Sequence, residues 1–359
     1  MRLCFIGNML GETAGYIPTQ GLIMARLFSE AGFDVTSASP KINKAARLAD
    51  IAAFLIKGRK RFDIVVLDVY SGQNLIMAET VGRLCRLFKL PLIMVLRGGN
   101  LPHFAAKRPR MMRRILERAD SLIAPSAFLA GSIKIPGLEI RVIPNILDLE
   151  KYPFRERSAI SPNLFWMRSF HPIYNPQMAV RVLAELKKSL PGATLTMAGV
   201  DKGLEDETKA AAAELGLTPS VRFAGFLDAA KKRVEFARAD IFINTNRVDN
   251  MPVAVVEACA MGLPVVATDA GGLPFLLSHG ETGLLVPNED VKAMAEAVKS
   301  LLNDPSLTRK LSRNGRKLAE RSAWKNVRFE WENLFAEVLN KKETVAGIGF
   351  LKRNSTVEN

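Results

Sequence analysis

Short apolar runs alternate along the chain with longer segments whose apolar residues recur every three or four positions. In the first part of the chain, helical spacing occurs at 21–31, 74–88 and 111–119. Repeated strand–helix–strand units predict a parallel sheet that is covered on both faces. The apolar runs that we expect to be its strands are residues 3–6, 64–67, 92–96, 122–124 and 142–143.

The alternation stops at residues 148–163, which are polar, contain Pro153 and Pro162, and predict a linker. A second series of strands and helices follows, so the fold class is α/β, with two doubly wound, Rossmann-like parallel-sheet domains in tandem. The second series has expected strands at 164–167, 194–198, 221–226, 241–244, 265–267 and 284–286, and expected helices at 176–190, 204–216, 228–238, 252–262 and 290–302.

This pattern predicts a first domain at 1–150 and a second at 151–323. A break at 322–323 precedes a helix at 324–340, which we expect to pack back on the first domain. The polar residues 341–359 predict a disordered tail. Open α/β sheets bind ligands outside the carboxyl ends of their strands. We therefore expect two facing domains that contribute strand ends to one cleft.

The net charge of +14 is distributed unevenly along the chain. Residues 1–149 contain 21 Lys and Arg against 11 Asp and Glu, a net charge of +10, and the remainder carries +4. Basic residues are densest at 57–61 and at 107–118, where they alternate with apolar ones. This second segment is either a basic amphipathic helix for an anionic membrane surface or a solvated helix whose apolar stripe faces the core. With four Tyr and three Trp, the chain lacks the stacking aromatics that favour a nucleic acid partner.

Neither end of the chain predicts export or membrane insertion. No stretch reaches the roughly 18 apolar residues of a membrane span, and residues 1–7 are too short an apolar run for a secretory signal. We therefore expect a cytoplasmic protein, peripheral on the inner membrane face if the basic segment docks there. Cys4, Cys85 and Cys259 lie in apolar runs without metal-type spacing and predict reduced core thiols.

The densest candidate for chemistry is the segment from Asp249 to Glu257, at the end of an expected strand. Residues 250–253 are expected to form the first turn of a helix, whose free N–H groups and positive dipole end favour a phosphate. Asp249 then lies at the mouth of this anion site and Glu257 deeper in the helix. Taken alone, Asp249 is better explained as a helix N-cap.

The residues around this segment resemble glycosyltransferase family 4, which has the GT-B fold. The resemblance is carried by E-A-C-A-M-G-L-P-V-V at 257–266, G-G-L-P at 271–274 and G-E-T-G-L-L-V-P at 280–287, with P-N-I-L-D at 144–148 in the first half. It implies a retaining hexosyltransferase that moves a sugar from a UDP- or GDP-type nucleotide sugar to a saccharide or lipid-linked acceptor. The implied setting is cell-surface polysaccharide or glycolipid synthesis, without a metal or other cofactor.

The resemblance also implies roles for individual residues. Arg168 clamps the donor diphosphate and Asp249 lies near the transferred sugar, which makes these two the catalytic candidates. Glu257 accepts hydrogen bonds from the ribose hydroxyls. The remaining candidates are Gly15 and the backbone N–H groups of Asn250, Met251 and Val253 for the donor phosphates, and Arg97, Asn100 and His103 for the acceptor side.

The sequence departs from the family pattern at several positions, among them 250–252, where Asn-Met-Pro replaces G-F-G. Asp249 replaces a Glu, Phe275 replaces another, and the place of a phosphate-binding Lys holds Ile173 or Tyr174. His171 either contacts phosphate instead or forms a turn. These departures leave open a nucleotide-sugar epimerase or hydrolase of the same fold, and a donor-binding partner without catalysis. A dehydrogenase is disfavoured because the first unit lacks a G-x-G-x-x-G fingerprint.

Overall fold

The computed structural model describes residues 1–9 and 19–354, with side chains through Lys341. The chain divides into two units, and each is described by itself. Unit 1 comprises Met1–Ile146 and Trp324–Asn359, and unit 2 comprises Leu147–Ala323. The first segment of unit 1 ends at Ile146, four residues before the boundary at residue 150 that the sequence predicts.

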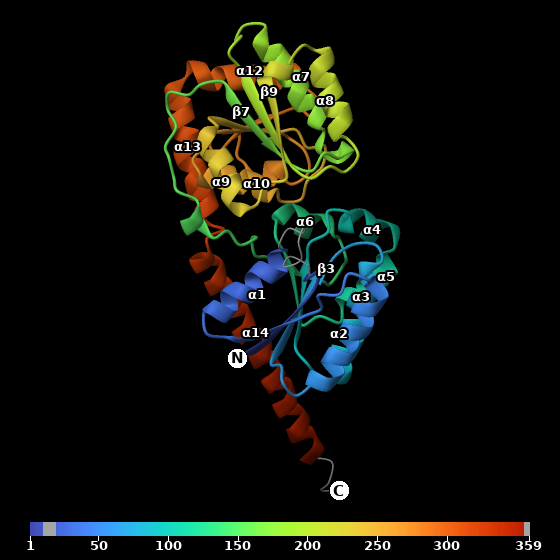
Figure 1. The fold of residues 1–359 in the computed structure, drawn as a ribbon. Coiled ribbons are helices and arrows are strands. Elements are labelled where there is room, and N and C mark those ends of the chain that lie inside the picture. Colours follow the sequence, from blue (N-terminus) through green and yellow to red (C-terminus); the bar gives the residue numbers. More distant parts are fainter. Residues whose placement is uncertain (10–18, 355–359) are drawn as a thin grey trace. The chain divides into compact units, whose positions relative to one another are not determined.

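Unit 1 contains a six-stranded sheet whose described pairings are all parallel, in the order β2-β1-β3-β4-β5-β6 (Figure 1). The order reverses between β1 and β3, which makes the sheet doubly wound. Its strands are β1 (Arg2–Ile6), β2 (Asp34–Ala38), β3 (Ile64–Val69), β4 (Leu92–Leu96), β5 (Ser121–Ala124) and β6 (Ile140–Val142). Its helices are α1 (Gln20–Glu30), α2 (Lys44–Gly58), α3 (Asn74–Leu87), α4 (Leu101–Lys107), α5 (Pro109–Leu116), α6 (Ala127–Ser132) and α14 (Trp324–Asn354).

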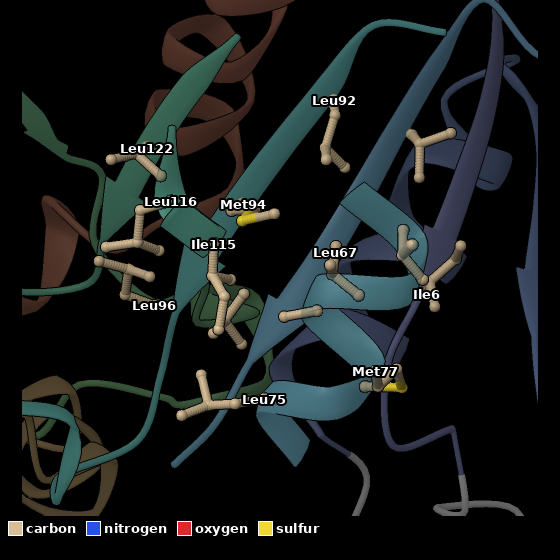
Figure 2. Packing of buried hydrophobic residues seen from close by; sticks show 14 of the residues in the cluster. Ile6, Leu67, Leu75, Met77, Leu92, Met94, Leu96, Ile115, Leu116 and Leu122 are labelled. Atoms are coloured by element: carbon tan, nitrogen blue, oxygen red, sulfur yellow. The ribbon is translucent and has the colours of Figure 1, made fainter. Parts of the chain in front are cut away.

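Two apolar clusters form the core of unit 1. Figure 2 shows the first, where Leu67 and Met94 of the strands face Leu75 and Met77 of α3 and Ile115 of α5. Because successive side chains of a strand point to opposite faces, their strand neighbours build the second cluster under α1 and α14. That second cluster includes Phe5, Val66, Phe28, Trp331 and Phe335.

The C-terminal helix α14 packs on the α1 side of unit 1, where the Trp324 ring centroid lies 4.9 Å from that of Phe28. The helix continues to Asn354, past residue 340, where the sequence analysis ended it. No proline interrupts residues 341–354, and the Lys, Arg and Leu residues there favour a helix, although Gly347 and Gly349 do not. The expectation of a disordered tail from residue 341 therefore does not hold for 341–354.

Helix α5 settles the alternative left open for the basic segment. Met112, Ile115 and Leu116 are buried against unit 1, Met111 is half-buried, and the arginines lie on the outer side. The apolar stripe therefore faces the core, as one of the two interpretations predicted. Insertion of these side chains into a bilayer is excluded.

Unit 2 repeats the architecture with a second six-stranded sheet, in the order β12-β11-β10-β7-β8-β9, whose described pairings are also parallel. The order reverses between β7 and β10, so both units are doubly wound and the predicted α/β class is confirmed. The strands are β7 (Asn163–Met167), β8 (Thr194–Ala198), β9 (Val221–Gly225), β10 (Ile241–Asn244), β11 (Val265–Thr268) and β12 (Leu284–Val286). The helices are α7 (Pro176–Lys187), α8 (Glu205–Glu214), α9 (Ala229–Arg238), α10 (Val253–Ala260), α11 (Leu273–Leu276), α12 (Val291–Asn303) and α13 (Pro305–Glu320).

The segment predicted to be a linker is fixed to unit 2. Arg157 is 2% exposed, and its guanidinium donates hydrogen bonds to the carbonyls of Phe236 (3.1 Å) and Ala239 (3.2 Å) at the end of α9. A cation at a helix C-terminus is favoured by the helix dipole. Burial lowers the pKa of Arg157 to about 10. The polar composition of this segment therefore reflects anchoring to α9 and its neighbours.

Candidate functional site

The switch point of the second sheet brings together the two residues that the sequence analysis proposed as catalytic. Arg168 directly follows β7, and Asp249 lies in the loop after β10, the strand that pairs with β7. Their side chains form an ion pair in which Arg168 is 21% exposed and Asp249 is 9% exposed. Residues 81 positions apart thus meet at the carboxyl edge of the sheet, where α/β folds bind ligands.

Arg168 is positioned by close backbone packing and by an aromatic ring. Its backbone N–H donates to the carbonyl of Ala198 at 3.1 Å. A Cβ on Gly199 would lie 1.8 Å from the Arg168 carbonyl oxygen, so only glycine fits beside it. The guanidinium lies over the ring of Tyr174, 4.2 Å from its centroid. Tyr174, one of the two residues that take the place of the family lysine, therefore holds the Arg168 guanidinium in a defined orientation.

Asp249 is held by three donors and by a pair of glycines. Besides Arg168, its carboxylate accepts hydrogen bonds from Asn246 Nδ2 at 2.7 Å and from the backbone N–H of Asn250 at 2.8 Å. A Cβ on Gly272 would lie 1.8 Å from the Asn250 carbonyl oxygen, which explains the glycine pair of the sequence motif. Burial raises the pKa of the Asp249 carboxyl, against the opposing attraction of Arg168. Asp249 is not the N-cap of α10, because that N-cap is Pro252.

The predicted phosphate-binding turn is only partly present. Helix α10 begins at Val253, so Asn250 and Met251 precede it and do not form its first turn. Pro252 at the N-cap breaks the helix there, because its ring disfavours helical geometry in the residue before it. The Asn250 N–H is also engaged by Asp249. Of the three predicted amides, that of Val253 is the one on the described helix.

Glu257 lies within α10, is 4% exposed, and has two partners that the sequence analysis did not predict. Its Oε1 accepts a hydrogen bond from the Tyr152 hydroxyl at 2.7 Å and forms an ion pair with Lys232 of α9. Tyr152 is 105 residues away in the sequence and Lys232 is 25 away. No motif connects the three, so only the fold reveals this cluster.

Two buried donors at these strand ends have no hydrogen-bond partner among the residues that the structure describes. They are Nε of Arg168, after β7, and Nδ2 of Asn244, the last residue of β10. Buried polar groups in folded proteins are nearly always paired, with water or a ligand where protein is lacking. Unpaired N–H groups beside a cation suit an acceptor-rich anion such as a phosphate.

The turn candidate His171 caps the short helix Pro172–Tyr174, and its Nδ1 accepts a hydrogen bond from the backbone N–H of Ile173 at 3.2 Å.

In unit 1, the Arg97 side chain is 9% exposed and donates hydrogen bonds to Asp68 (2.5 Å) and to Asn145 Oδ1 (2.8 Å). Asn100 and His103 are exposed at the start of α4. Among the described residues, neither Asn100 nor His103 forms a hydrogen bond with Arg97. Gly15 lies outside the described residues.

Two kinds of feature are absent from the described part of the chain. Its His, Cys, Asp and Glu side chains form no group of three that is able to hold a metal ion. None of its helices combines the length and the apolar character needed to cross a bilayer. Cys4, Cys85 and Cys259 are buried free thiols, as predicted.

Comparison with known proteins places residues 155–318 in a family model described as Glycosyl transferases group 1. The chain is 26% identical over 275 residues to glycogen synthase of Mycobacterium tuberculosis, which covers 72% of this chain and 66% of that protein. It is 30% identical over 214 residues to the GDP-mannose-dependent alpha-(1-6)-phosphatidylinositol monomannoside mannosyltransferase of Mycolicibacterium smegmatis, covering 54% and 56%. The chain thus spans less than two thirds of the length of these relatives.

Solved structures match over nearly the whole chain. Sucrose-phosphate synthase from Thermosynechococcus elongatus matches with a TM-score of 0.79 and 18% identity, over 95% of this chain and 100% of that one. Anabaena Alr3699/HepE in complex with UDP-glucose matches with a TM-score of 0.71 and 18% identity, over 95% and 100%. These likenesses confirm the predicted GT-B fold.

Proposed function

We propose, for a chain whose residues 155–318 belong to the group 1 glycosyltransferases, that unit 2 binds a nucleotide sugar and that the protein transfers its sugar to a hydroxyl of an acceptor. The observation that carries the proposal is the Arg168–Asp249 pair at the switch point of the second sheet. A cation and a carboxylate at this edge match the two ends of such a donor, which has an anionic diphosphate and a neutral sugar rich in hydroxyls.

Arg168 is assigned to the diphosphate. Its stacking on Tyr174 fixes the plane of the guanidinium, and its Nε remains unpartnered for a phosphate oxygen. As the bond between sugar and diphosphate breaks, negative charge grows on the leaving group. A fixed cation and the N–H of Val253 at the start of α10 stabilise that charge. Protein groups thus supply the neutralisation, and no step of the proposal requires a metal.

Asp249 is assigned to the sugar. Its carboxylate is oriented by Asn246 and the Asn250 N–H, and accepts hydrogen bonds that sugar hydroxyls are able to donate. Retention of configuration at the anomeric carbon is part of the proposal and rests on the family resemblance. A UDP- or GDP-type donor is supported by Anabaena Alr3699/HepE in complex with UDP-glucose and by the GDP-mannose-dependent relative.

The acceptor is assigned to unit 1, and we propose a saccharide or lipid-linked acceptor near an anionic membrane surface. Three basic residues around the start of α5 support docking: Lys107, Arg108 and Arg110 are exposed and form no ion pair with any described residue. Asn100 and His103, exposed on the neighbouring helix α4, are the candidates for acceptor hydroxyls. Arg97 is already paired with Asp68, so its proposed role is to fix that edge of the sheet.

The test is transfer of label from radioactive UDP-glucose, UDP-N-acetylglucosamine and GDP-mannose into lipid extract or added oligosaccharide. The expected result is acceptor-dependent label in the lipid or saccharide fraction with one of these donors. Label released as free sugar irrespective of acceptor identifies a hydrolase, and label in an isomeric nucleotide sugar identifies an epimerase. Donor binding without turnover identifies a non-catalytic partner. Each of these last three results contradicts the transferase proposal.

A further inference from the structure

The cluster of buried Glu257 and Tyr152 with half-buried Lys232 is more polar than packing alone requires. It lies beside an apolar cluster of unit 2 that includes Tyr152 itself, Phe165 and Phe236. Burying a carboxylate and an ammonium is costly, and an apolar set of similar volume is often at least as stable. The cluster therefore calls for an explanation beyond stability.

The geometry of the hydrogen bonds is asymmetric. Tyr152 and Lys232 both bind Oε1 of Glu257, and no described residue donates a hydrogen bond to Oε2. Burial and the nearby Glu257 carboxylate raise the pKa of Tyr152, so its hydroxyl remains a donor. Two donors on one oxygen fix the plane of the carboxylate and leave the second oxygen to accept from something else.

We propose that Lys232 and Tyr152 are positioning residues that hold Glu257 so that its free oxygen accepts hydrogen bonds from the ribose hydroxyls of the donor nucleotide. The inference rests on the proposed function, a nucleotide-sugar site in unit 2, and on the ribose-binding role that the family resemblance implies for Glu257. Lys232 also forms an ion pair with this carboxylate, and a charged acceptor makes a hydrogen bond about twice as strong as a neutral one. Without Lys232, the ribose loses a fixed acceptor although Glu257 is still present.

The cluster also ties the donor site to the chain segment that enters unit 2. Tyr152 follows the short helix Leu149–Lys151, a few residues after unit 2 begins at Leu147. Its carbonyl oxygen accepts a hydrogen bond from Arg316 of α13 at 2.9 Å. The Tyr152 hydroxyl is thus held by a backbone that is itself anchored, as a positioning residue requires.

The test compares the affinities of a nucleoside diphosphate and its 2′,3′-dideoxy analogue by calorimetry. The probe is whichever of UDP, GDP or ADP binds the wild-type protein. The ratio of the two affinities measures the contribution of the ribose hydroxyls to binding. A purely structural defect weakens the binding of both ligands alike and leaves this ratio unchanged. For charge-assisted hydrogen bonds, wild type is expected to prefer the ribose form by roughly ten- to a hundredfold.

The variants are Lys232→Met, Tyr152→Phe and, as a matched control, Lys231→Gln. Lys231 is the neighbouring lysine on α9, with a side chain 71% exposed and a distant partner in Asp228 at 3.8 Å. We expect the preference to fall at least about fivefold in Lys232→Met and Tyr152→Phe, to stay unchanged in Lys231→Gln, and to be largely retained in Lys232→Arg. Tyr152→Phe keeps the ring volume, so it gives an answer even if Lys232→Met does not fold.

Two outcomes overturn the proposal in distinguishable ways. If wild type prefers the ribose form and both variants retain that preference, Lys232 and Tyr152 do not position Glu257, while the donor site stands. If wild type binds both ligands equally, Glu257 does not bind the ribose, and the role that the family resemblance implies for Glu257 fails with the inference, while nucleotide binding by unit 2 stands.

Discussion

Replacing Arg168 by alanine is predicted to weaken the protein in two separable ways, one in stability and one in donor binding. The change removes the ion pair with Asp249 and the contact with Tyr174, and leaves a carboxylate that is 9% exposed without its cation. Breaking a fully buried pair from one side costs about 3–5 kcal/mol. Here Asp249 keeps hydrogen bonds from Asn246 and the Asn250 N–H, and Arg168 is 21% exposed. The expected loss of unfolding free energy is therefore smaller, about 2–3 kcal/mol.

The effect on the donor follows from the lost contact with phosphate. A hydrogen bond to a charged group contributes about 1.5–3 kcal/mol, so the affinity for a nucleoside diphosphate should fall roughly 10- to 100-fold. Turnover should fall on the order of a hundredfold, because the cation also stabilises charge that develops in the transition state. Urea unfolding measures the first effect, and calorimetry with steady-state turnover measures the second.

The double variant Arg168→Ala with Asp249→Asn separates the two effects. Neutralising the orphaned carboxylate should restore about 1–2 kcal/mol of stability, since the two side chains are in contact and their effects are coupled. Nucleotide affinity should stay low, because the phosphate partner is still missing. Turnover of Arg168→Ala within threefold of wild type refutes the assignment. Recovery of nucleotide affinity in the double variant shows that Arg168 serves only to neutralise Asp249.

Three further predictions address the supports of the site, the anchored segment and the basic surface. Gly199→Ala places a Cβ 1.8 Å from the Arg168 carbonyl oxygen, so it should lower stability by about 1–3 kcal/mol and should also weaken donor binding. Gly192→Ala is the control, because no described atom lies within 4 Å of its Cβ. Equal behaviour of the two variants in thermal unfolding and calorimetry contradicts the packing argument. Arg157→Gln removes the hydrogen bonds to the carbonyls at the end of α9 and should lower the free energy of unfolding, measured in urea, by about 2 kcal/mol. Arg155 is exposed, and Arg155→Gln should change that free energy by less than about 0.5 kcal/mol. Lys107, Arg108 and Arg110 should together contribute about 3 kcal/mol to docking on anionic vesicles. Co-sedimentation of the protein with these vesicles should therefore be lost in high salt and in a variant with all three residues changed to glutamine. If the protein pellets equally with neutral vesicles, or with neither kind, a soluble acceptor is favoured.

The sequence predicts the fully buried strands well and misses one edge strand, β2. The central strands read as continuous apolar runs because both faces of a parallel sheet are covered. The edge strand β2, Asp34–Ala38, has one buried residue among five, so no apolar run marks it, and the sequence analysis missed it together with α2 (Lys44–Gly58). Edge position alone is not the reason, because the edge strand β9 (Val221–Gly225) has no buried residue and was predicted.

The candidate site shows the same division between local and distant information. The glycine pair Gly271–Gly272 is visible in the sequence, but its reason, contact with the Asp249–Asn250 backbone, is visible only in the fold. The start of α10 was placed too early because Pro252 suits both a first turn and an N-cap. The partners of Glu257 come from α9 and the segment after Leu147, and no spacing rule joins residues on separate elements.

The central claim is that the carboxyl edge of unit 2 around Arg168 binds a nucleotide sugar. A thermal-unfolding panel of UDP-, GDP- and ADP-sugars with wild type and Arg168→Ala tests it most directly. A ligand at 100 times its dissociation constant adds about 2.7 kcal/mol of stability, which corresponds to a rise of several degrees in Tm. We predict such a rise for wild type with one class of nucleotide sugar, and a rise at least halved in Arg168→Ala at the same ligand concentration. No rise with any donor, or an equal rise in both proteins, contradicts the claim.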